Sequence, residues 1–188
     1  MGSMKPDLMR YLQQGRDVLL WKLDGLGEYD IRRPMVPTGT NLLGLVKHLA
    51  TGEAAYLGLV FGRPFPEQIL WERDFGPNED MYATAEESRE AVIDFYKRTW
   101  AHADATVDEL DLDAVGEVPW WPEDRRHPTL HRVLVHVIAE TDRHAGHADI
   151  LRELIDGQVG FRPEVENMDD RADWKEQWAM LEEIAKNA

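Results

Sequence analysis

The most constraining feature of this chain is a run of four side chains able to bind a transition metal, all within one stretch of helical pattern. His136, Glu140, His144 and His147 follow one another at steps of four, four and three residues. Because an α-helix turns roughly 100° per residue, such steps keep side chains on one stripe of the helix. The run therefore predicts a helix that presents its imidazoles and its carboxylate in one direction.

The same stripe continues into Leu151 and Leu154, which predicts that it faces a core and not water. Burying a carboxylate or an imidazole costs free energy unless another group compensates it. A bound divalent cation is the simplest compensation. The position of the stripe therefore predicts a metal site inside the protein.

Five helical segments are predicted from the spacing of apolar residues and from the glycines and prolines that flank them. They span about residues 6–26, 40–61, 84–110, 128–156 and 171–186. Thr38 or Thr40 is the expected N-cap of the second segment. Thr84 and Glu87 predict a capping box at the start of the third, and Gly157 predicts the end of the fourth. No alternating pattern typical of a strand is visible, so the expected fold is an all-α four-helix bundle with an additional C-terminal helix.

The length of 188 residues suits one domain. We expect a single domain over residues 4–188, with the bundle over about residues 5–157. The extension over about residues 158–188 carries the short fifth helix, which we expect to pack across the bundle as a lid or brace.

The charge and the residue types exclude several classes of protein. The formal net charge is −15, which disfavours binding to nucleic acid or to an anionic membrane. No apolar run approaches the roughly 18 residues of a membrane span, and no signal peptide is visible, so we expect a cytoplasmic protein. Because the chain has no cysteine, disulfides, thiolate ligands and a cysteine nucleophile are excluded.

Glu140 and His144 are the best pair of candidate metal ligands, since side chains at i and i+4 can reach one ion from one helix. A third ligand is expected from a facing helix, where His48 is the one histidine of the second segment and has core-type neighbours. Two histidines and one carboxylate with open coordination positions suit Zn²⁺, Ni²⁺, Fe²⁺ or Mn²⁺ in a catalytic site.

Several alternatives stay open at this point. Any one of these histidines, taken alone, could be a core or boundary residue with ordinary hydrogen bonds. His147 could replace Glu140 as a ligand, or act as a base or as the partner of a ligand. His136 lies two turns from His144, which places it outside the expected metal shell. Trp120 and Trp121 either border a substrate pocket or plug one end of the bundle.

Two stretches of the sequence resemble the DinB-like (DinB/YfiT-like) family of bacterial four-helix-bundle metalloproteins, and look like an actinobacterial subgroup of it. They are residues 37–50, which end in Lys-His48-Leu-Ala, and residues 140–157, which begin Glu-Thr-Asp-Arg-His144. The resemblance covers about residues 5–157. It implies one divalent ion held by His48, Glu140 and His144. Many members have His where this chain has Glu140, whereas the mycothiol-dependent isomerase branch has Glu.

The resemblance also implies a function. Members include metal-dependent thiol S-transferases and isomerases that use a low-molecular-weight thiol such as mycothiol or bacillithiol, with a small electrophile as the second substrate. The metal would activate the thiol as a thiolate, and His147 would accept or relay the proton. The alternative is a non-catalytic metal-binding stress-response protein, which a closed site or the lack of a pocket would favour. A second copy of the chain is a further candidate partner, in a homodimer.

Overall fold

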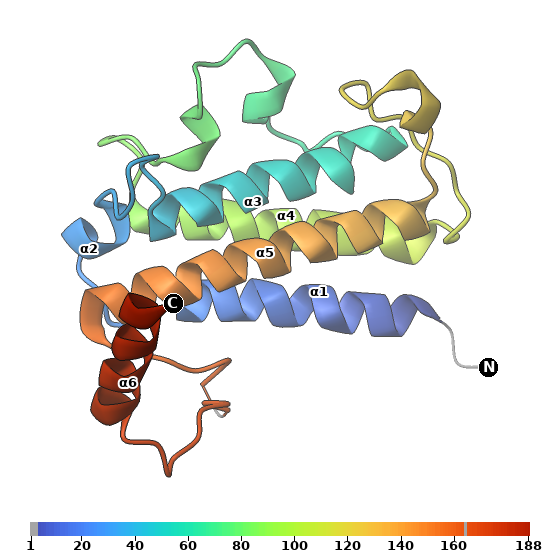
Figure 1. Ribbon diagram of the computed structural model, residues 1–188. Coiled ribbons are helices and arrows are strands. Elements are labelled where there is room, and N and C mark those ends of the chain that lie inside the picture. Colours follow the sequence, from blue (N-terminus) through green and yellow to red (C-terminus); the bar gives the residue numbers. More distant parts are fainter. Residues whose placement is uncertain (1–3, 164) are drawn as a thin grey trace.

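The computed structural model describes residues 4–163 and 165–188, and four long helices form its body. These are α1 (Met4–Trp21), α3 (Leu42–Tyr56), α4 (Arg89–Glu109) and α5 (Leu130–Asp156), which lie along a common direction (Figure 1). Two shorter helices accompany them, α2 (Glu28–Arg32) and α6 (Trp174–Asn187). Among the described residues there is no β-strand, only two isolated bridges. The predicted all-α four-helix bundle with an additional C-terminal helix is confirmed.

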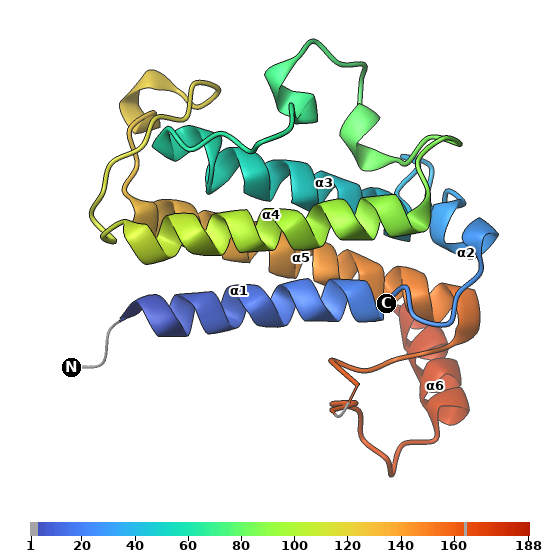
Figure 2. The same cartoon turned by 180° about the vertical axis from the view of Figure 1, so that it is seen from behind.

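The four long helices are not connected in a simple up-and-down order. α3 packs against α4 and α5, and α1 packs against α5. α3 and α4 run in the same direction because the connection over residues 57–88 returns along the outside of α3 before α4 begins (Figure 1 and Figure 2). This connection contains 3₁₀ turns at Leu59–Phe61, Leu70–Glu72 and Glu79–Met81. A segment predicted to be a loop therefore covers one helix of the bundle.

Two helix starts differ from the prediction because local polar groups make other hydrogen bonds. Asn41, and not either predicted threonine, caps α3 by accepting a hydrogen bond from the backbone N–H of Gly44 at 2.8 Å. The Thr84 N–H donates to the Glu87 carboxylate at 2.7 Å, but this pair forms a turn and not a capping box. Helix α4 begins only after Ser88, which is its actual N-cap.

Glycines follow the ends of two other helices, and the last helix differs from its prediction in its burial. The first helix ends at Trp21, earlier than predicted, and Gly25 in the turn that follows has a φ of 76°. Gly157 caps α5 with a φ of 79°, as predicted, because glycine adopts this left-handed conformation without strain. None of the residues of α6 is buried, so the expectation that this helix braces the bundle is wrong.

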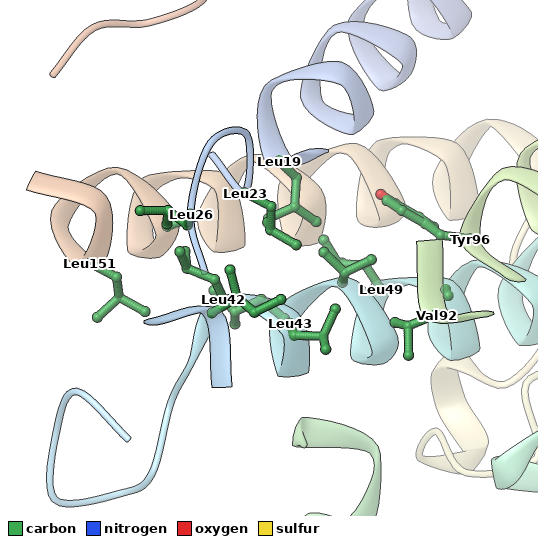
Figure 3. Close-up of a cluster of buried hydrophobic side chains, with 14 residues drawn as sticks. Leu19, Leu23, Leu26, Leu42, Leu43, Leu49, Val92, Tyr96 and Leu151 are labelled. Carbon is green, nitrogen blue, oxygen red and sulfur yellow. The ribbon is translucent and has the colours of Figure 1, made fainter. Parts of the chain in front are cut away.

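Two apolar clusters fill the bundle. In the first, shown in Figure 3, buried leucines point towards one another: Leu19 of α1, Leu23 of the turn that follows α1, Leu42, Leu43 and Leu49 of α3, and Leu151 of α5. The second includes Leu12, Tyr56, Val107, Leu130 and Val133. Between Leu49 of the first cluster and Tyr56 of the second, α3 carries a buried charge, Glu53.

That charge belongs to an ion pair that joins three helices. Arg16 of α1 is fully buried and donates to the Glu53 carboxylate through Nε at 3.3 Å and also through Nη2. Its Nη1 donates to Asp104 of α4 at 2.9 Å. Burial raises the pKa of Glu53, and the positive charge of Arg16 opposes this rise. The pair fixes the rotation of α3 relative to α1 and α4.

None of the helices within the described residues is long and apolar enough to cross a membrane.

Gly44→Ala tests whether the 57–88 connection packs closely on α3. A Cβ added at Gly44 would lie 1.9 Å from the carbonyl oxygen of Met81, so backbone must move. We expect a loss of roughly 1–3 kcal/mol in the free energy of unfolding, the usual cost of overpacking. The control is Gly146→Ala on the exposed face of α5, where nothing lies within 4 Å of the added Cβ. This control should be neutral or stabilising by up to about 1 kcal/mol. Urea unfolding of both variants measures the difference, and equal effects would contradict the close approach.

Candidate functional site

The bundle brings the three predicted metal ligands to the seam between α3 and α5. The ring centroids of His48 and His144 lie 4.9 Å apart, although 96 positions separate them in the sequence (144 − 48). The His144 Nε2 atom lies 3.7 Å from a carboxylate oxygen of Glu140, one helical turn away. The donors of one helix therefore face the donor of the other.

The polar stripe of α5 runs along the edge of its buried face and not along its centre. Glu140 and His144 are partly buried, but His147 is exposed and Leu154 is 62% exposed. The centre of the buried face is formed by neighbouring positions such as Thr141, which is 1% exposed. The expectation that the whole stripe faces a core is therefore wrong. The edge position leaves the site accessible from solvent.

The 57–88 connection supports His48 from behind. The His48 Nδ1 atom lies 2.7 Å from a carboxylate oxygen of Asp80, and the Trp71 indole N–H donates to the same oxygen at 3.2 Å. Burial raises the pKa of Asp80, but the hydrogen bonds from His48 and Trp71 and the charge of His48 outweigh this effect and lower it. Asp80 is thus a carboxylate that orients the His48 ring and leaves Nε2 as the ring nitrogen available to another partner.

His144 is held in a similar way by His147. Their Nδ1 atoms lie 3.2 Å apart, so the remaining nitrogen of His144 is the Nε2 that faces Glu140. Burial, together with the nearby His48, His147 and Arg143, lowers the pKa of His144 to about 4. Its imidazole is therefore neutral at neutral pH, which is the form that coordinates a metal.

The imidazole nitrogens and carboxylate oxygens of this arrangement are donor atoms that divalent metal ions bind. A metal-binding histidine usually has its second ring nitrogen bonded to a carboxylate, a carbonyl or water, as His48 is to Asp80. Two donors that each lie about 2.1 Å from one ion can be at most about 4.2 Å apart, and the 3.7 Å between His144 and Glu140 satisfies this limit. Over residues 4–163 and 165–188, no three His, Asp or Glu side chains already form a complete ion-binding group. Glu140, with a side chain 42% exposed, has the freedom to rotate and complete one.

A cavity of about 230 Å³ lies directly beside these residues. Its lining includes His48, Gly52, Tyr56, Trp71, His136 and Glu140, and its surface is mostly apolar. Glu53 also borders it but is paired with Arg16. The cavity gives a small molecule a place to bind next to His48 and Glu140.

A larger hollow of about 460 Å³ lies between α3, α4 and the 57–88 connection. Its charged side chains are already neutralised by ion pairs, among them Lys47 with Glu87 and Arg98 with Glu67. The smaller cavity is therefore the better candidate site, because it combines imidazoles, a carboxylate and an apolar wall.

His136 lies away from the His48–His144 pair, against the aromatic end of the cavity. Its ring centroid lies 4.7 Å from that of Tyr56 and 5.2 Å from that of Trp121. Burial lowers the pKa of His136, so its imidazole is neutral at neutral pH. His136 contributes to the wall of the cavity.

Asp80, Trp71 and Tyr56 are the site residues that sequence reasoning missed. Asp80 and Trp71 lie in a segment without helical periodicity, so no pattern placed them near α3. Tyr56 continues the apolar side of α3 and looks like an ordinary core residue. The one available signal was the number of large apolar residues in this loop, among them Ile69, Leu70 and Trp71, which favours packing against the bundle.

The fold and the α3–α5 seam define a DinB-like four-helix bundle, and comparison with known proteins gives the family. The chain belongs to the mycothiol S-transferase family, a DinB/YfiT-like family whose model matches residues 7–157. The chain is similar to the crystal structure of the conserved protein of locus from Enterococcus faecalis, with a TM-score of 0.62 and 16% identity. That similarity covers 84% of this chain and 100% of the other, and it shows a shared fold. No curated protein matches the chain significantly. The resemblance stated from the sequence is confirmed.

The lowered pKa of His144 predicts how the stability of the metal-free protein depends on pH. In the unfolded chain a histidine titrates near pH ~6.5, whereas folded His144 takes up its proton only near pH 4. The unfolded state therefore binds the proton first as the pH falls, and the free energy of unfolding should decrease between about pH 6.5 and pH 4. Urea unfolding after treatment with EDTA measures this decrease. The free energy of unfolding should decrease less in His144→Gln. The control His131→Gln, at an exposed position, should show the same decrease as the unaltered chain. A decrease as steep in His144→Gln as in the unaltered chain would rule out His144 as its source.

Proposed function

We propose that this protein is a metal-dependent thiol S-transferase that joins a low-molecular-weight thiol, such as mycothiol, to a small electrophile. Membership of the mycothiol S-transferase family supports the thiol chemistry. The observation that carries the site is that His48 and His144 face each other beside a cavity, each with its Nδ1 already engaged. His48, Glu140 and His144 would hold one divalent ion, Zn²⁺, Ni²⁺, Fe²⁺ or Mn²⁺.

The chemistry needs a sulfur nucleophile from outside the chain, because the protein has no cysteine. When bound, the ion would supply a positive charge that lowers the pKa of a coordinated thiol, as zinc does for bound water. Asp80 would keep the His48 ring in its coordinating orientation. His147, which is exposed and contacts His144, would carry the thiol proton towards solvent. An isomerase would use the same thiol adduct and then release the thiol.

The second candidate is a non-catalytic metal-binding stress-response protein. It would use the same three ligands but would have no need of a cavity beside them. The cavity of about 230 Å³ next to His48 and Glu140 favours the transferase. The net charge of −15 agrees with small-molecule partners in preference to nucleic acid, and we propose a cytoplasmic location.

Ligand substitutions test the metal site. His48→Ala and His144→Ala should each abolish or greatly weaken metal binding, since each removes one of three protein donors. Glu140→Gln should weaken binding less, because an amide oxygen can still coordinate. Asp80→Asn should weaken it by roughly 10- to 100-fold through the orientation of His48.

The measurement is elemental analysis and metal titration of protein purified without a nickel column. Glu79→Gln is the matched control, because Glu79 neighbours Asp80 but pairs with Arg73. If His48→Ala keeps stoichiometric metal at the original affinity, the assignment to α3 is wrong, and His147 and His136 become the next variants to measure.

Metal removal tests catalysis. A free thiol of pKa ~8.5 is mostly protonated at pH 7, so complete ionisation would raise the thiolate concentration by roughly 30-fold. Metal-loaded protein should therefore accelerate thiol addition to several model electrophiles by at least roughly 10-fold, and EDTA-treated protein should not. His147→Ala should lower the rate while the metal content stays the same. Equal rates for loaded and stripped protein with mycothiol, bacillithiol and glutathione would favour the non-catalytic protein.

A further inference from the structure

Aromatic rings form much of the cavity wall, from Trp71 next to His48 to Tyr56 about two turns further along α3. Tyr56, Trp71 and His136 line the cavity. The Tyr56 ring centroid lies 6.0 Å from that of Trp71 and 5.4 Å from that of Trp120, both in edge-to-face geometry. Such walls favour flat molecules, because ring edges and faces attract each other at these separations.

The hydroxyl of Tyr56 has an unusual set of hydrogen bonds. The indole N–H groups of Trp120 and Trp121 both donate to its oxygen, at 3.0 and 3.1 Å. A tyrosine oxygen has two acceptor positions, and an indole nitrogen can only donate. Tyr56 can therefore form its remaining hydrogen bond only by donating its own proton. Tyr56 is 9% exposed, and no acceptor for that proton is present among the residues that the structure describes.

The charges of the lining restrict the ligand further. None of the described residues that border the cavity is a lysine or arginine, while Glu53 and Glu140 contribute carboxylates. Among these side chains a negatively charged molecule would find no cationic partner, and the charge of the proposed divalent ion beside them would already be neutralised by Glu140 and the bound thiolate. The volume of about 230 Å³ is below the roughly 300 Å³ at which typical ligand pockets begin, which suits a molecule with a single ring.

We propose that this cavity is the electrophile site, and that it takes a small, flat, uncharged electrophile whose carbonyl oxygen accepts a hydrogen bond from Tyr56. The inference rests on the proposed thiol transfer and adds to it the class of the second substrate. Trp120 and Trp121 act as positioning residues, because their two N–H groups occupy the acceptor positions of the Tyr56 oxygen and leave its hydroxyl to act as a donor. Among the described residues that border the cavity, Tyr56 is the one that both indoles contact by hydrogen bonds, and Trp121 also packs against the second apolar cluster.

An electrophile with a carbon–carbon double bond next to the carbonyl group would accept the thiol by conjugate addition. The thiol loses its proton to solvent, and its sulfur forms a bond to the β-carbon. The electron pair of the carbon–carbon double bond moves to the bond between the α-carbon and the carbonyl carbon, and the carbonyl pair moves onto oxygen, where the Tyr56 hydroxyl stabilises the developing negative charge. A proton from water then adds to the α-carbon, so that S–H has added across the double bond. One such donor is worth roughly 100-fold in rate.

Binding of unreactive probes tests the pocket without thiol or turnover. Acetophenone is flat and has a carbonyl acceptor, ethylbenzene has the same shape without the acceptor, and benzoate is charged. With protein as purified, titration followed by indole fluorescence and calorimetry should show acetophenone binding about 10-fold more tightly than ethylbenzene, since one hydrogen bond is worth about that factor. Benzoate, measured on EDTA-treated protein so that its carboxylate cannot coordinate the ion, should bind more weakly than both. Equal affinities for acetophenone and ethylbenzene, or no binding of acetophenone, would overturn the proposal.

Two variants assign the effect to this cavity. Tyr56→Phe should abolish the preference for acetophenone over ethylbenzene. Gly52→Leu should weaken both probes, because a Cβ at Gly52 meets only Trp71, at 3.7 Å, and a longer side chain would fill the cavity. Thermal unfolding checks that each variant is folded, and the comparison of probes on the unaltered protein needs no variant. A Tyr56→Phe protein that is folded and keeps the preference would overturn the role of the hydroxyl.

Turnover separates this inference from the proposed function. Metal-loaded protein is assayed with mycothiol and either phenyl vinyl ketone, which has the carbonyl acceptor, or benzyl chloride, which lacks it. Tyr56→Phe should reduce kcat/KM at least ten times more for the ketone than for the chloride. If neither substrate reacts but acetophenone is preferred, thiol transfer fails and the pocket stands. If both react and acetophenone is not preferred, the pocket fails and thiol transfer stands.

Discussion

The buried contact of Arg16 with Glu53 and Asp104 is the interaction on which the arrangement of the helices depends. A guanidinium with no exposed surface must be paired, because an unpaired buried charge is strongly destabilising. Arg16 meets this requirement only when α1, α3 and α4 have one particular rotation relative to one another. With Glu53 turned towards Arg16, His48, roughly 140° away around α3, turns towards α5. The ion pair thus determines which side of α3 becomes the site.

The connection over residues 57–88 is the second determinant, because it supplies parts of the site that no helix could. Gly44 lets the backbone near Met81 approach α3, and the neighbouring Asp80 then reaches His48. Trp71 shares Asp80 with His48 and forms a wall of the cavity. The orientation of His48 therefore depends on a close backbone contact at the start of α3.

The site has two ends with different chemistry. At the α3–α5 seam, His48, His144 and Glu140 supply donors typical of a divalent-metal site, and Asp80 and His147 hold the two imidazole rings from behind. At the other end, aromatic rings surround the Tyr56 hydroxyl. Its oxygen already accepts two hydrogen bonds, so any further one must be donated. Polar donors at one end and a flat apolar wall at the other suit the proposed reaction between a thiol and an uncharged electrophile.

Local spacing predicted the helices, and it predicted that Glu140 and His144 lie one turn apart on the same side of α5. Helical periodicity and i, i+4 neighbours are properties of nearby residues. The two motifs around His48 and His144 were enough to identify the family. The helix starts after Asn41 and Ser88 were missed, since several polar residues compete there for the same backbone N–H groups. Only the tertiary structure placed Asp80, Trp71 and Tyr56 at the site and left His147 and Leu154 exposed. A segment without periodicity contains no local signal of where it packs, and the exposure of a helical stripe depends on which neighbouring helices cover it.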